Sequence, residues 1–301
     1  MKKTAFDIVA NQDLSGKTFL ITGGYAGLGA ISTEALLKAG ARVVIAGRSA
    51  KTQADYEESR KGNAELKFSD EQLDASHTLD LGDLASVRDF ALYIRENYQQ
   101  IDCLLNNAGV MNTPPGKTKD GFEIQMGINV IGHFLLSKML VEITKRQIWL
   151  SSKGHIRYGA PRIDLAAITE VDDNNYISRH RYQQAKLGDI LLAKQFAKAY
   201  PHLKTAAVHP GGVKTNLGRY MTTMQKVKFV LKMPHVLWSM VEPEVGASTQ
   251  VMVSILPEDE LVNGAYYVDC KVAQEAESAK NMEDAQKLFD YCEKVTKAFQ
   301  V

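Results

Sequence analysis

Tyr182 and Lys186 are the pair of residues in this sequence whose types and spacing most directly suggest chemistry. They are the first and last residues of YQQAK, in a stretch with helical periodicity, so the phenol and the ammonium would lie on one helix face about one turn apart. A tyrosine, with a reference pKa of about 10, is a poor base at neutral pH, but a nearby cation stabilises the phenolate. The pair therefore predicts proton exchange with a reacting oxygen. Taken alone, the spacing also fits an exposed helix pair.

A glycine-rich turn near the amino terminus could hold a phosphate. The run TGGYAGLG follows a predicted strand and opens a helical pattern, and it contains Gly23, Gly27 and Gly29. Without Cβ atoms the backbone can approach a pyrophosphate, which the free N–H groups and the positive end of a helix stabilise. The turn predicts a dinucleotide site, with an ordinary strand-to-helix turn as the alternative.

The end of the second predicted strand indicates which nicotinamide nucleotide fits. A site for NAD carries Asp or Glu at this point to accept hydrogen bonds from the ribose 2′-hydroxyl, whereas this chain has Gly47 followed by Arg48. A guanidinium pairs with a 2′-phosphate that a carboxylate would repel. The sequence therefore favours NADP(H), unless Arg48 is only a solvated residue at a strand end.

Short apolar segments alternate with amphipathic ones along most of the chain, and these elements must position the residues above. The segments that we expect as buried strands are 17–22, 42–46, 77–81, 101–106, 147–151 and 203–209. Helical patterns lie between them, for example Val87, Phe90, Ala91 and Ile94. This alternation predicts an α/β fold with a mostly parallel sheet, right-handed crossovers and helices on both faces. No linker separates two halves, and the polar stretch 60–72 is expected to be a surface insertion.

The charge balance and the cysteines argue against several classes of protein. Lys and Arg number 36 against 35 Asp and Glu, a formal net charge of +1, which disfavours a nucleic-acid partner. The three cysteines are too widely spaced for a CxxC metal site, and His133 and His155 lack partners at metal-ligand spacing. Because we find neither a secretory signal nor an apolar stretch of about 18 residues, we expect a cytoplasmic protein with neither a metal nor a transmembrane segment.

Five motifs follow one another in a specific order. TGGYAGLG is followed by NNAG at 106–109, SS at 151–152, YQQAK and HPGG. In these motifs the chain closely resembles the short-chain dehydrogenase/reductase family, over residues 15–295. Segments such as LDLGDLASVRDF and GAYYVDC are similar to the retinol-dehydrogenase-like branch. The resemblance implies a Rossmann-type doubly wound parallel β-sheet, with residues 1–301 forming a single NAD(P)-binding domain.

The resemblance assigns four residues to the reaction. Tyr182 would protonate the carbonyl oxygen during reduction, or accept the proton in the reverse direction, and Lys186 would lower the pKa of Tyr182 and bind the nicotinamide ribose. Ser152 would donate a hydrogen bond to the substrate oxygen, and Asn129 would bind a water that links Lys186 to solvent. The hydride would come from the cofactor, so the protein supplies position and a proton.

The resemblance also carries over the residues that would bind NADP(H). Asp80 would meet the edge of the adenine and Leu81 its ring, unless Asp80 serves only as an N-cap or turn residue. His209 is expected to end a strand rather than to act in catalysis. The full set of expected cofactor-binding residues is Gly23, Gly27, Leu28, Gly29, Arg48, Asp80, Leu81, Asn107, Ala108, Tyr182, Lys186, Pro210, Val213 and Thr215.

Two segments vary from the family pattern. Ser152 and Tyr182 lie 30 positions apart, so an insertion at about 153–178 must loop out and return Tyr182 to the site. HPGG replaces the more usual PG followed by a bulky apolar residue.

A substrate lid is expected at about 216–241, and its apolar, Met-rich character predicts a lipophilic substrate. Weak contact of this segment with a membrane surface, and plain core or dimer packing, are the alternatives.

Together these residues predict an NADP(H)-dependent oxidoreductase that transfers a hydride between nicotinamide and a lipophilic ketone, aldehyde or secondary alcohol, with NAD as the alternative cofactor. A regulator that binds NADP(H) without turnover is the alternative function, but it would not need Asn129, Ser152, Tyr182 and Lys186 together. An enzyme related to light-dependent protochlorophyllide reductase is disfavoured because HPGGVKT lacks a cysteine. Relatives often pair through their fourth and fifth helices, so a homodimer or tetramer is expected.

Overall fold

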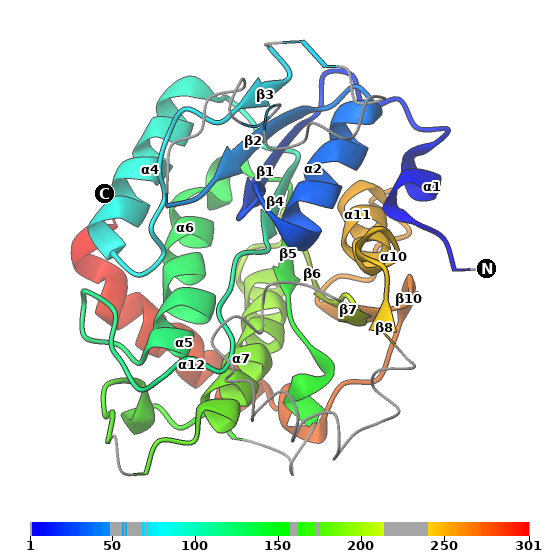
Figure 1. Cartoon of the computed structure of the whole chain (residues 1–301). Helices are drawn as coiled ribbons and strands as arrows, with labels where there is room; N and C mark the ends of the chain where they lie inside the picture. The colour runs from blue at the N-terminus through cyan, green and yellow to red at the C-terminus, as the bar shows by residue number, and fades with distance from the viewer. Residues whose placement is uncertain are drawn as a thin grey trace.

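An eight-stranded sheet runs through the molecule, and helices cover both of its faces (Figure 1). The computed structural model describes residues 2–48, 56, 58, 68–69, 71–156, 162–172, 175–213 and 240–300. Thr215, most of the expected lid and most of the polar stretch 60–72 lie outside the described residues.

The strand order of the sheet is β10-β9-β6-β5-β4-β1-β2-β3. All neighbouring strands are parallel except the β9–β10 hairpin. The chain therefore moves outward from β1 in one direction to β3 and in the other to β9, so that β1 and β4 flank the topological switch point at which open α/β sheets bind ligands. The strands are β1 Thr18–Thr22, β2 Arg42–Ala46, β3 Leu73–Asp74, β4 Cys103–Asn106, β5 Arg146–Leu150, β6 Lys204–His209, β9 Ala265–Val268 and β10 Lys271–Val272, with a separate pair β7 Gly212–Val213 and β8 Met240–Val241.

The helices form two layers, one on each face of the sheet, as predicted. One layer contains α4, α6, α7 and α12, and the other contains α1, α2 and α11 (Figure 1). The helix bounds are α1 Ala5–Val9, α2 Gly27–Lys38, α4 Leu84–Asn97, α5 Ile124–Met126, a π-helix Gly127–Gly132, α6 His133–Met139, α7 Ser178–Ala199, α10 Pro243–Gly246, α11 Ser248–Ile255 and α12 Met282–Thr296. Short 3-10 turns span Val141–Ile143, Lys153–Ile156, Ala166–Ile168, Glu277–Lys280 and Lys297–Phe299.

The core has two parts because the sheet is buried on both faces. Along β1, Leu20 packs into the cluster under α4, α6, α7 and α12, whereas Phe19 and Ile21 pack into the cluster under α1, α2 and α11. Side chains alternate between the faces of a strand, so a strand covered on both sides is apolar at nearly every position. This burial explains the short continuous apolar runs by which the strands were predicted.

One prediction about the sheet was wrong, and one feature of the sheet was missed. The segment 77–81 is not a strand; β3 is Leu73–Asp74, and within 77–81 Thr78 makes an isolated bridge to the residue after β2. The backbone N–H and hydroxyl of Ser76 bind the carboxylate of Asp74 at 3.0 and 2.7 Å, which makes a turn that interrupts the pairing. The antiparallel edge hairpin of β9 and β10 was not predicted at all.

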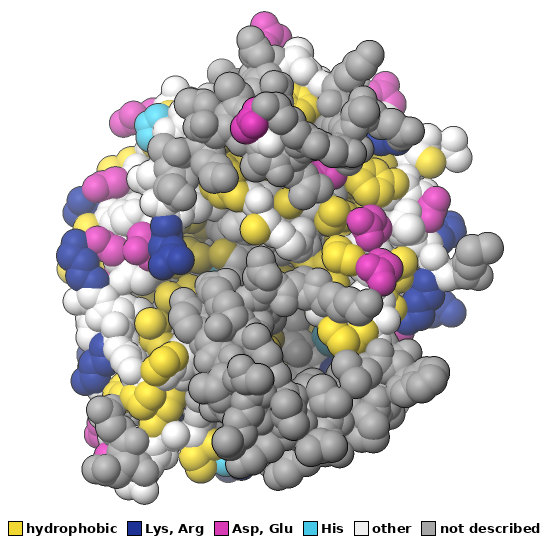
Figure 2. Space-filling model, viewed as in Figure 1, with side chains coloured by type: hydrophobic (Ala, Val, Ile, Leu, Met, Phe, Trp, Pro, Cys, Tyr) yellow, Lys and Arg dark blue, Asp and Glu magenta, His cyan; other side chains and the backbone are white. Residues whose placement is uncertain are grey.

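The surface carries both signs of charge in close proximity. On the face seen in Figure 2, Lys and Arg side chains lie beside Asp and Glu among the residues drawn in colour. Within the described part of the chain, no helix combines the length and apolar character needed to cross a membrane.

Arg146, the first residue of β5, is a buried cation that joins the sheet to the carboxyl end of α11. Its guanidinium donates to the backbone carbonyls of Val253 at 2.9 Å and Leu256 at 2.6 Å. The last carbonyls of a helix lack intrahelical partners and carry partial negative charge, so they compensate the buried guanidinium. The contact fixes α11 against the strand that leads to Ser152.

Replacing Arg146 with Leu should therefore lower the free energy of unfolding by about 3 kcal/mol, because two carbonyls lose a charged donor. Arg146→Lys keeps the charge but reaches fewer acceptors, so it should lose less stability than the Leu variant. Urea unfolding followed by circular dichroism measures both. A Leu variant as stable as the wild type would contradict this role.

Candidate active site

Ser152 lies beside Tyr182 and Lys186 in the structure, although it is far from both of them in the sequence. Ser152 follows the end of β5, and Tyr182 and Lys186 lie one turn apart on α7. The side chains of Tyr182 and Ser152 lie side by side, since a Cβ atom on Gly154 would be 3.3 Å from both the Oγ atom of Ser152 and the Tyr182 ring. The Nζ atom of Lys186 lies 5.7 Å from the centre of the Tyr182 ring. The N–H of Gly154 donates to the Oγ atom of Ser152 at 3.0 Å. Two hydroxyls therefore face one point beside a cation.

Lys186 is buried, and its ammonium is held by two acceptors. Its Nζ atom lies 2.7 Å from the backbone carbonyl of Leu150, at the end of β5, and 2.8 Å from the Oδ2 atom of Asp189 on α7. Asp189 was missed by the sequence analysis. Its position three residues after Lys186 in a predicted helix was the signal that could have identified it.

The charges around Tyr182 act in opposite directions on its proton. Burial raises the pKa of Tyr182, while Lys186 and the hydrogen bond from Ser152 act to lower it. Lys186 therefore acts to lower the pKa of Tyr182, as predicted, but the opposite effect of burial is larger. The ammonium itself stays charged, because the carboxylate of Asp189 raises the pKa of Lys186 against the effect of burial.

Asn129 lies in the π-helix, buried beside this group. Its side chain accepts the N–H of Val110 and donates to the carbonyl of Val110, both at 2.9 Å. A Cβ atom on Gly109 would lie 3.1 Å from the Oδ1 atom of Asn129 and 3.9 Å from the Nζ atom of Lys186. Asn129 therefore borders the lysine, while its place in a proton relay stays a prediction.

Thr22, the last residue of β1, connects the loop after β4 to the helix that carries Asn129. Its Oγ1 atom accepts the N–H groups of Asn107 and Ala108, both at 2.9 Å, and lies 2.9 Å from the Nε2 atom of His133. The Nδ1 atom of His133 lies 3.0 Å from the carbonyl of Asn129. A carbonyl can only accept, so we assign the imidazole proton to Nδ1, and Nε2 accepts from the threonine hydroxyl.

The glycine-rich turn passes directly beneath the loop after β4. Gly23 has a φ of 69°, in the region that favours glycine. A Cβ atom on Gly29 would lie 2.3 Å from the carbonyl oxygen of Gly23 and 2.6 Å from the amide nitrogen of Asn107, so only glycine fits there. Helix α2 starts at Gly27 after Ala26, whose side chain cannot cap the helix N–H groups. The turn therefore has the features of an anion cradle.

The end of β2 is shaped by a residue that the sequence analysis did not single out. A Cβ atom on Gly47 would lie 2.8 Å from the ring of Tyr25, so the tyrosine of the glycine-rich turn takes the space of a side chain at position 47. Arg48, next along the chain, is exposed. Asp80 makes a turn, since its Oδ1 atom accepts the N–H of Gly82 at 2.9 Å.

The remaining expected cofactor residues are only partly described. Leu28, at the start of α2, and Val213, in β7, both lie against Gly246, where an added Cβ atom would be 3.1 Å from Leu28 and 2.4 Å from Val213. Pro210 follows β6, which ends at His209 as predicted. Thr215 lies outside the described residues.

A polar network ties the end of the expected insertion to the region around α5. The hydroxyl of Tyr176 donates to the carboxylate of Glu123 at 2.6 Å, and the amide of Gln125 donates to the carbonyl of Ser178, the first residue of α7, at 2.9 Å. The Ser178 hydroxyl donates to the carbonyl of Thr113 at 2.7 Å. The start of α7, one turn before Tyr182, is thereby held from two sides.

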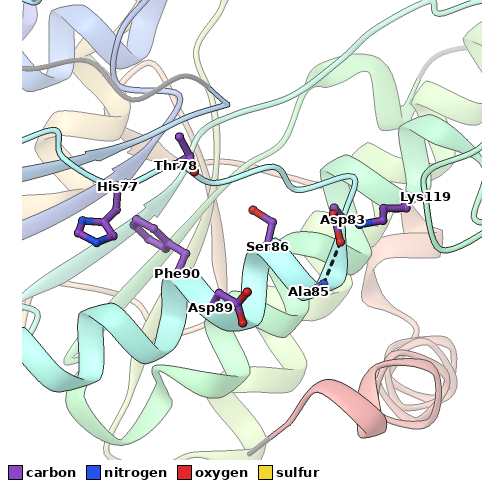
Figure 3. Close-up of a pocket in the computed structure, with 8 residues that line it drawn as sticks. All are labelled: His77, Thr78, Asp83, Ala85, Ser86, Asp89, Phe90 and Lys119. Atoms are coloured by element: carbon purple, nitrogen blue, oxygen red, sulfur yellow. Dashed lines mark hydrogen bonds and ion pairs between the residues drawn. The ribbon is translucent and has the colours of Figure 1, made fainter.

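A cavity of about 380 Å³ lies beside the first turns of α4 (Figure 3). Asp83 there accepts the N–H of Ala85 at the start of the helix and forms an ion pair with Lys119. The cavity is lined by His77, Thr78, Asp83, Ala85, Ser86, Asp89, Phe90 and Lys119. None of these was predicted as a site residue, and Ser152, Tyr182 and Lys186 are not among them. In the described ranges, no cluster of three or more His, Cys, Asp or Glu residues could hold a metal ion.

Comparison with known proteins decides the family. The family model of short chain dehydrogenases matches residues 17–226. The chain belongs to the short-chain dehydrogenase family. Its curated relatives include retinol dehydrogenase 14 of Mus musculus, 34% identical over 294 residues that cover 93% of this chain and 86% of the relative. Retinol dehydrogenase 13 of Homo sapiens is 31% identical over 291 residues, 92% of this chain and 83% of the relative. The predicted retinol-dehydrogenase-like branch is thus confirmed.

Solved structures of other proteins share the fold of this short-chain dehydrogenase. A structure of an uncharacterized protein from Mycobacterium paratuberculosis has a TM-score of 0.74 at 26% identity, covering 99% of this chain and 98% of the other. NADPH-bound carbonyl reductase from chicken fatty liver has a TM-score of 0.59 at 21% identity, covering 88% of this chain and 100% of the other. These likenesses confirm the predicted Rossmann-type fold.

His133 gives this short-chain dehydrogenase a testable dependence of stability on pH. Burial lowers the pKa of His133 to about 3, so it is neutral in the folded protein, whereas an unfolded histidine takes up a proton below about pH 6.5. The stability that His133 contributes is therefore present above pH 6.5 and lost as the pH falls toward 3. At 1.36 kcal/mol per pH unit, the loss between pH 7 and pH 5 is about 2 kcal/mol.

His133→Gln should remove about that much of the difference between the free energies of unfolding at pH 7 and pH 5. Urea unfolding of the wild type and the variant at both pH values measures it. The difference between pH values cancels any constant loss of stability in the variant. An unchanged difference would show that His133 is protonated in the folded protein.

Proposed function

We propose that this short-chain dehydrogenase is an NADP(H)-dependent oxidoreductase that transfers a hydride between nicotinamide and a lipophilic ketone, aldehyde or secondary alcohol. The observation that carries the proposal is that the side chains of Ser152 and Tyr182 adjoin each other beside the buried ammonium of Lys186. A binding protein would not need two converging hydroxyls next to a buried charge.

The chain's own residues would manage the oxygen and its proton. The hydroxyls of Ser152 and Tyr182 would both donate to a carbonyl oxygen, which develops negative charge during reduction. Tyr182 would then give its proton to that oxygen, with the charge of Lys186 stabilising the phenolate left behind. In the oxidation of an alcohol the same groups act in reverse. NADPH, when bound, supplies the hydride.

The described residues fit a dinucleotide with a 2′-phosphate. The glycine-rich turn at the start of α2 can cradle a pyrophosphate, for which Gly29 leaves the necessary space. At the end of β2 the ring of Tyr25 stands where the acidic side chain of an NAD site would begin. The exposed guanidinium of Arg48 is the next group along the chain and suits a phosphate.

A lipophilic substrate is supported by the relatives and by the composition of the expected lid. Curated relatives of this chain are named retinol dehydrogenases, and retinol is a lipophilic alcohol. The stretch at about 216–241 is rich in Met, Val and Leu. Such side chains suit an apolar and adaptable pocket.

Tyr182→Phe should lower kcat by about 10³-fold in carbonyl reduction, because it removes the proton donor and little else. The assay is turnover of a panel of lipophilic ketones and aldehydes, including retinal, with NADPH. Tyr291→Phe, on α12, is the matched control and should keep the wild-type rate. Binding of NADPH by the wild type with no turnover of any carbonyl would instead support a non-catalytic regulator.

Arg48→Ala should raise the KM for NADPH about tenfold to a hundredfold and leave the KM for NADH nearly unchanged, because only NADPH carries the 2′-phosphate. Steady-state kinetics with both cofactors measures the effect. Lys287→Ala, an exposed cation of α12, controls for the loss of one positive charge. A wild-type preference for NADH would contradict the role of Arg48.

A further inference from the structure

We propose that Asp189 is a positioning residue that limits how strongly Lys186 can stabilise the phenolate of Tyr182, and thereby extends to higher pH the range over which Tyr182 keeps its proton. The inference rests on the proposed function, because it concerns the proton that Tyr182 exchanges with substrate. It adds to that function one residue, Asp189, that shifts the pH range of the reaction and favours carbonyl reduction.

The geometry of the pair is that of a buried, directly bonded ion pair. The Oδ2 atom of Asp189 lies 2.8 Å from the Nζ atom of Lys186, and the two side chains are 3% and 7% exposed. Both residues lie on the same face of α7, three positions apart. The carbonyl of Leu150 accepts a second hydrogen bond from the ammonium, at 2.7 Å. Lys186 therefore has two of its three N–H groups fixed, in a site with little water to screen charge.

A carboxylate in this place weakens the stabilisation that Lys186 gives to the phenolate of Tyr182. An isolated ammonium next to the tyrosine would favour the phenolate strongly, since charges interact far more in a buried site than in water. The carboxylate of Asp189 cancels part of that field and favours the neutral phenol. In agreement with this, Lys186 acts to lower the pKa of Tyr182 and Asp189 acts to raise it.

Asp189 is ionised at neutral pH but titrates within the range of an enzyme assay. Burial raises the pKa of Asp189 to about 6, even with Lys186 beside it. Above that pH the ionised carboxylate of Asp189 disfavours the phenolate form of Tyr182. As the pH falls below 6, Asp189 takes up a proton and Lys186 loses its counter-charge.

The two histidines that face this site are neutral at neutral pH, and the second tyrosine keeps its proton there. His133, on α6, is neutral because burial lowers its pKa to about 3. Burial also lowers the pKa of His155, whose Nε2 atom accepts the N–H of Ala276, and raises the pKa of Tyr266 on β9. Glu275, beside these two rings, is paired with a lysine of α7. Changes above pH 6 therefore belong to Asp189 and Tyr182.

The test is the pH dependence of turnover in Asp189→Asn, which keeps the size of the side chain and removes the charge. Reduction is lost at high pH as Tyr182 loses its proton, and oxidation of the alcohol rises over the same range. Without Asp189 both midpoints should move to lower pH by about 1 unit or more. Midpoints that stay in place, with only the rates reduced, would overturn the proposal and leave Asp189 a structural residue.

Two variants control for charge and for folding. Glu293→Gln removes one carboxylate from the ion pair with Lys138, away from the site, and should leave both midpoints unchanged. A shift in this variant equal to that of Asp189→Asn would mean that the effect is one of net charge, against the proposal. Asp189→Ser also removes the charge and serves if the Asn variant does not fold; it should show the same shift.

A titration without substrate separates this proposal from the proposed function. The ultraviolet difference between the wild type and Tyr182→Phe reports the ionisation of that one tyrosine as the pH rises. The same difference, measured in the Asp189→Asn background, should give a midpoint about 1 unit lower. An equal midpoint in both backgrounds would refute the role of Asp189. If no carbonyl is turned over but this midpoint moves, the proposed function fails and the coupling of Asp189 to Tyr182 stands.

Discussion

The buried ammonium of Lys186 is the constraint on which the arrangement of the site depends. A charge in an apolar interior is strongly unfavourable unless it is paired and hydrogen-bonded. Its acceptors are the carbonyl of Leu150, at the end of β5, and the carboxylate of Asp189, on α7. The ammonium can reach both acceptors only when α7 packs against the end of β5. The same packing brings Tyr182 to Ser152, two residues beyond the strand.

A second set of hydrogen bonds connects the other half of the site. Thr22 ends β1, the strand that leads into the glycine-rich turn, and it holds the loop after β4 through the N–H groups of Asn107 and Ala108. His133 extends this connection to the π-helix, where Asn129 borders Lys186. The expected phosphate cradle and the residues proposed to transfer the proton are therefore connected by hydrogen bonds across the switch point of the sheet.

Local pattern predicted most of the fold, and contacts distant in sequence account for what it missed. The strands buried on both faces and the helices between them follow from apolar runs and helical spacing. The hairpin of β9 and β10 follows from pairing at the sheet edge, and the interruption at 77–81 follows from a turn made by Asp74; neither leaves a periodic signal. Within the site, YQQAK indicated the tyrosine and the lysine. The effect of Tyr25 on position 47 became visible only once the chain had folded back on itself.

The long segment between Ser152 and Tyr182 shows how a family geometry can tolerate an insertion. The proposed catalytic arrangement needs α7 to begin in the right place, and contacts at the end of the segment, rather than its length, set that place. Tyr176 is held by Glu123, and the first turn of α7 by Gln125. Closing a longer loop costs little additional free energy, since the entropy grows only with the logarithm of the length. Within the segment Ile168 is also held, since its side chain is buried in the core and its carbonyl accepts the N–H of Glu123 at 2.6 Å. This contact and the polar partners at the end of the segment together bring Tyr182 to Ser152.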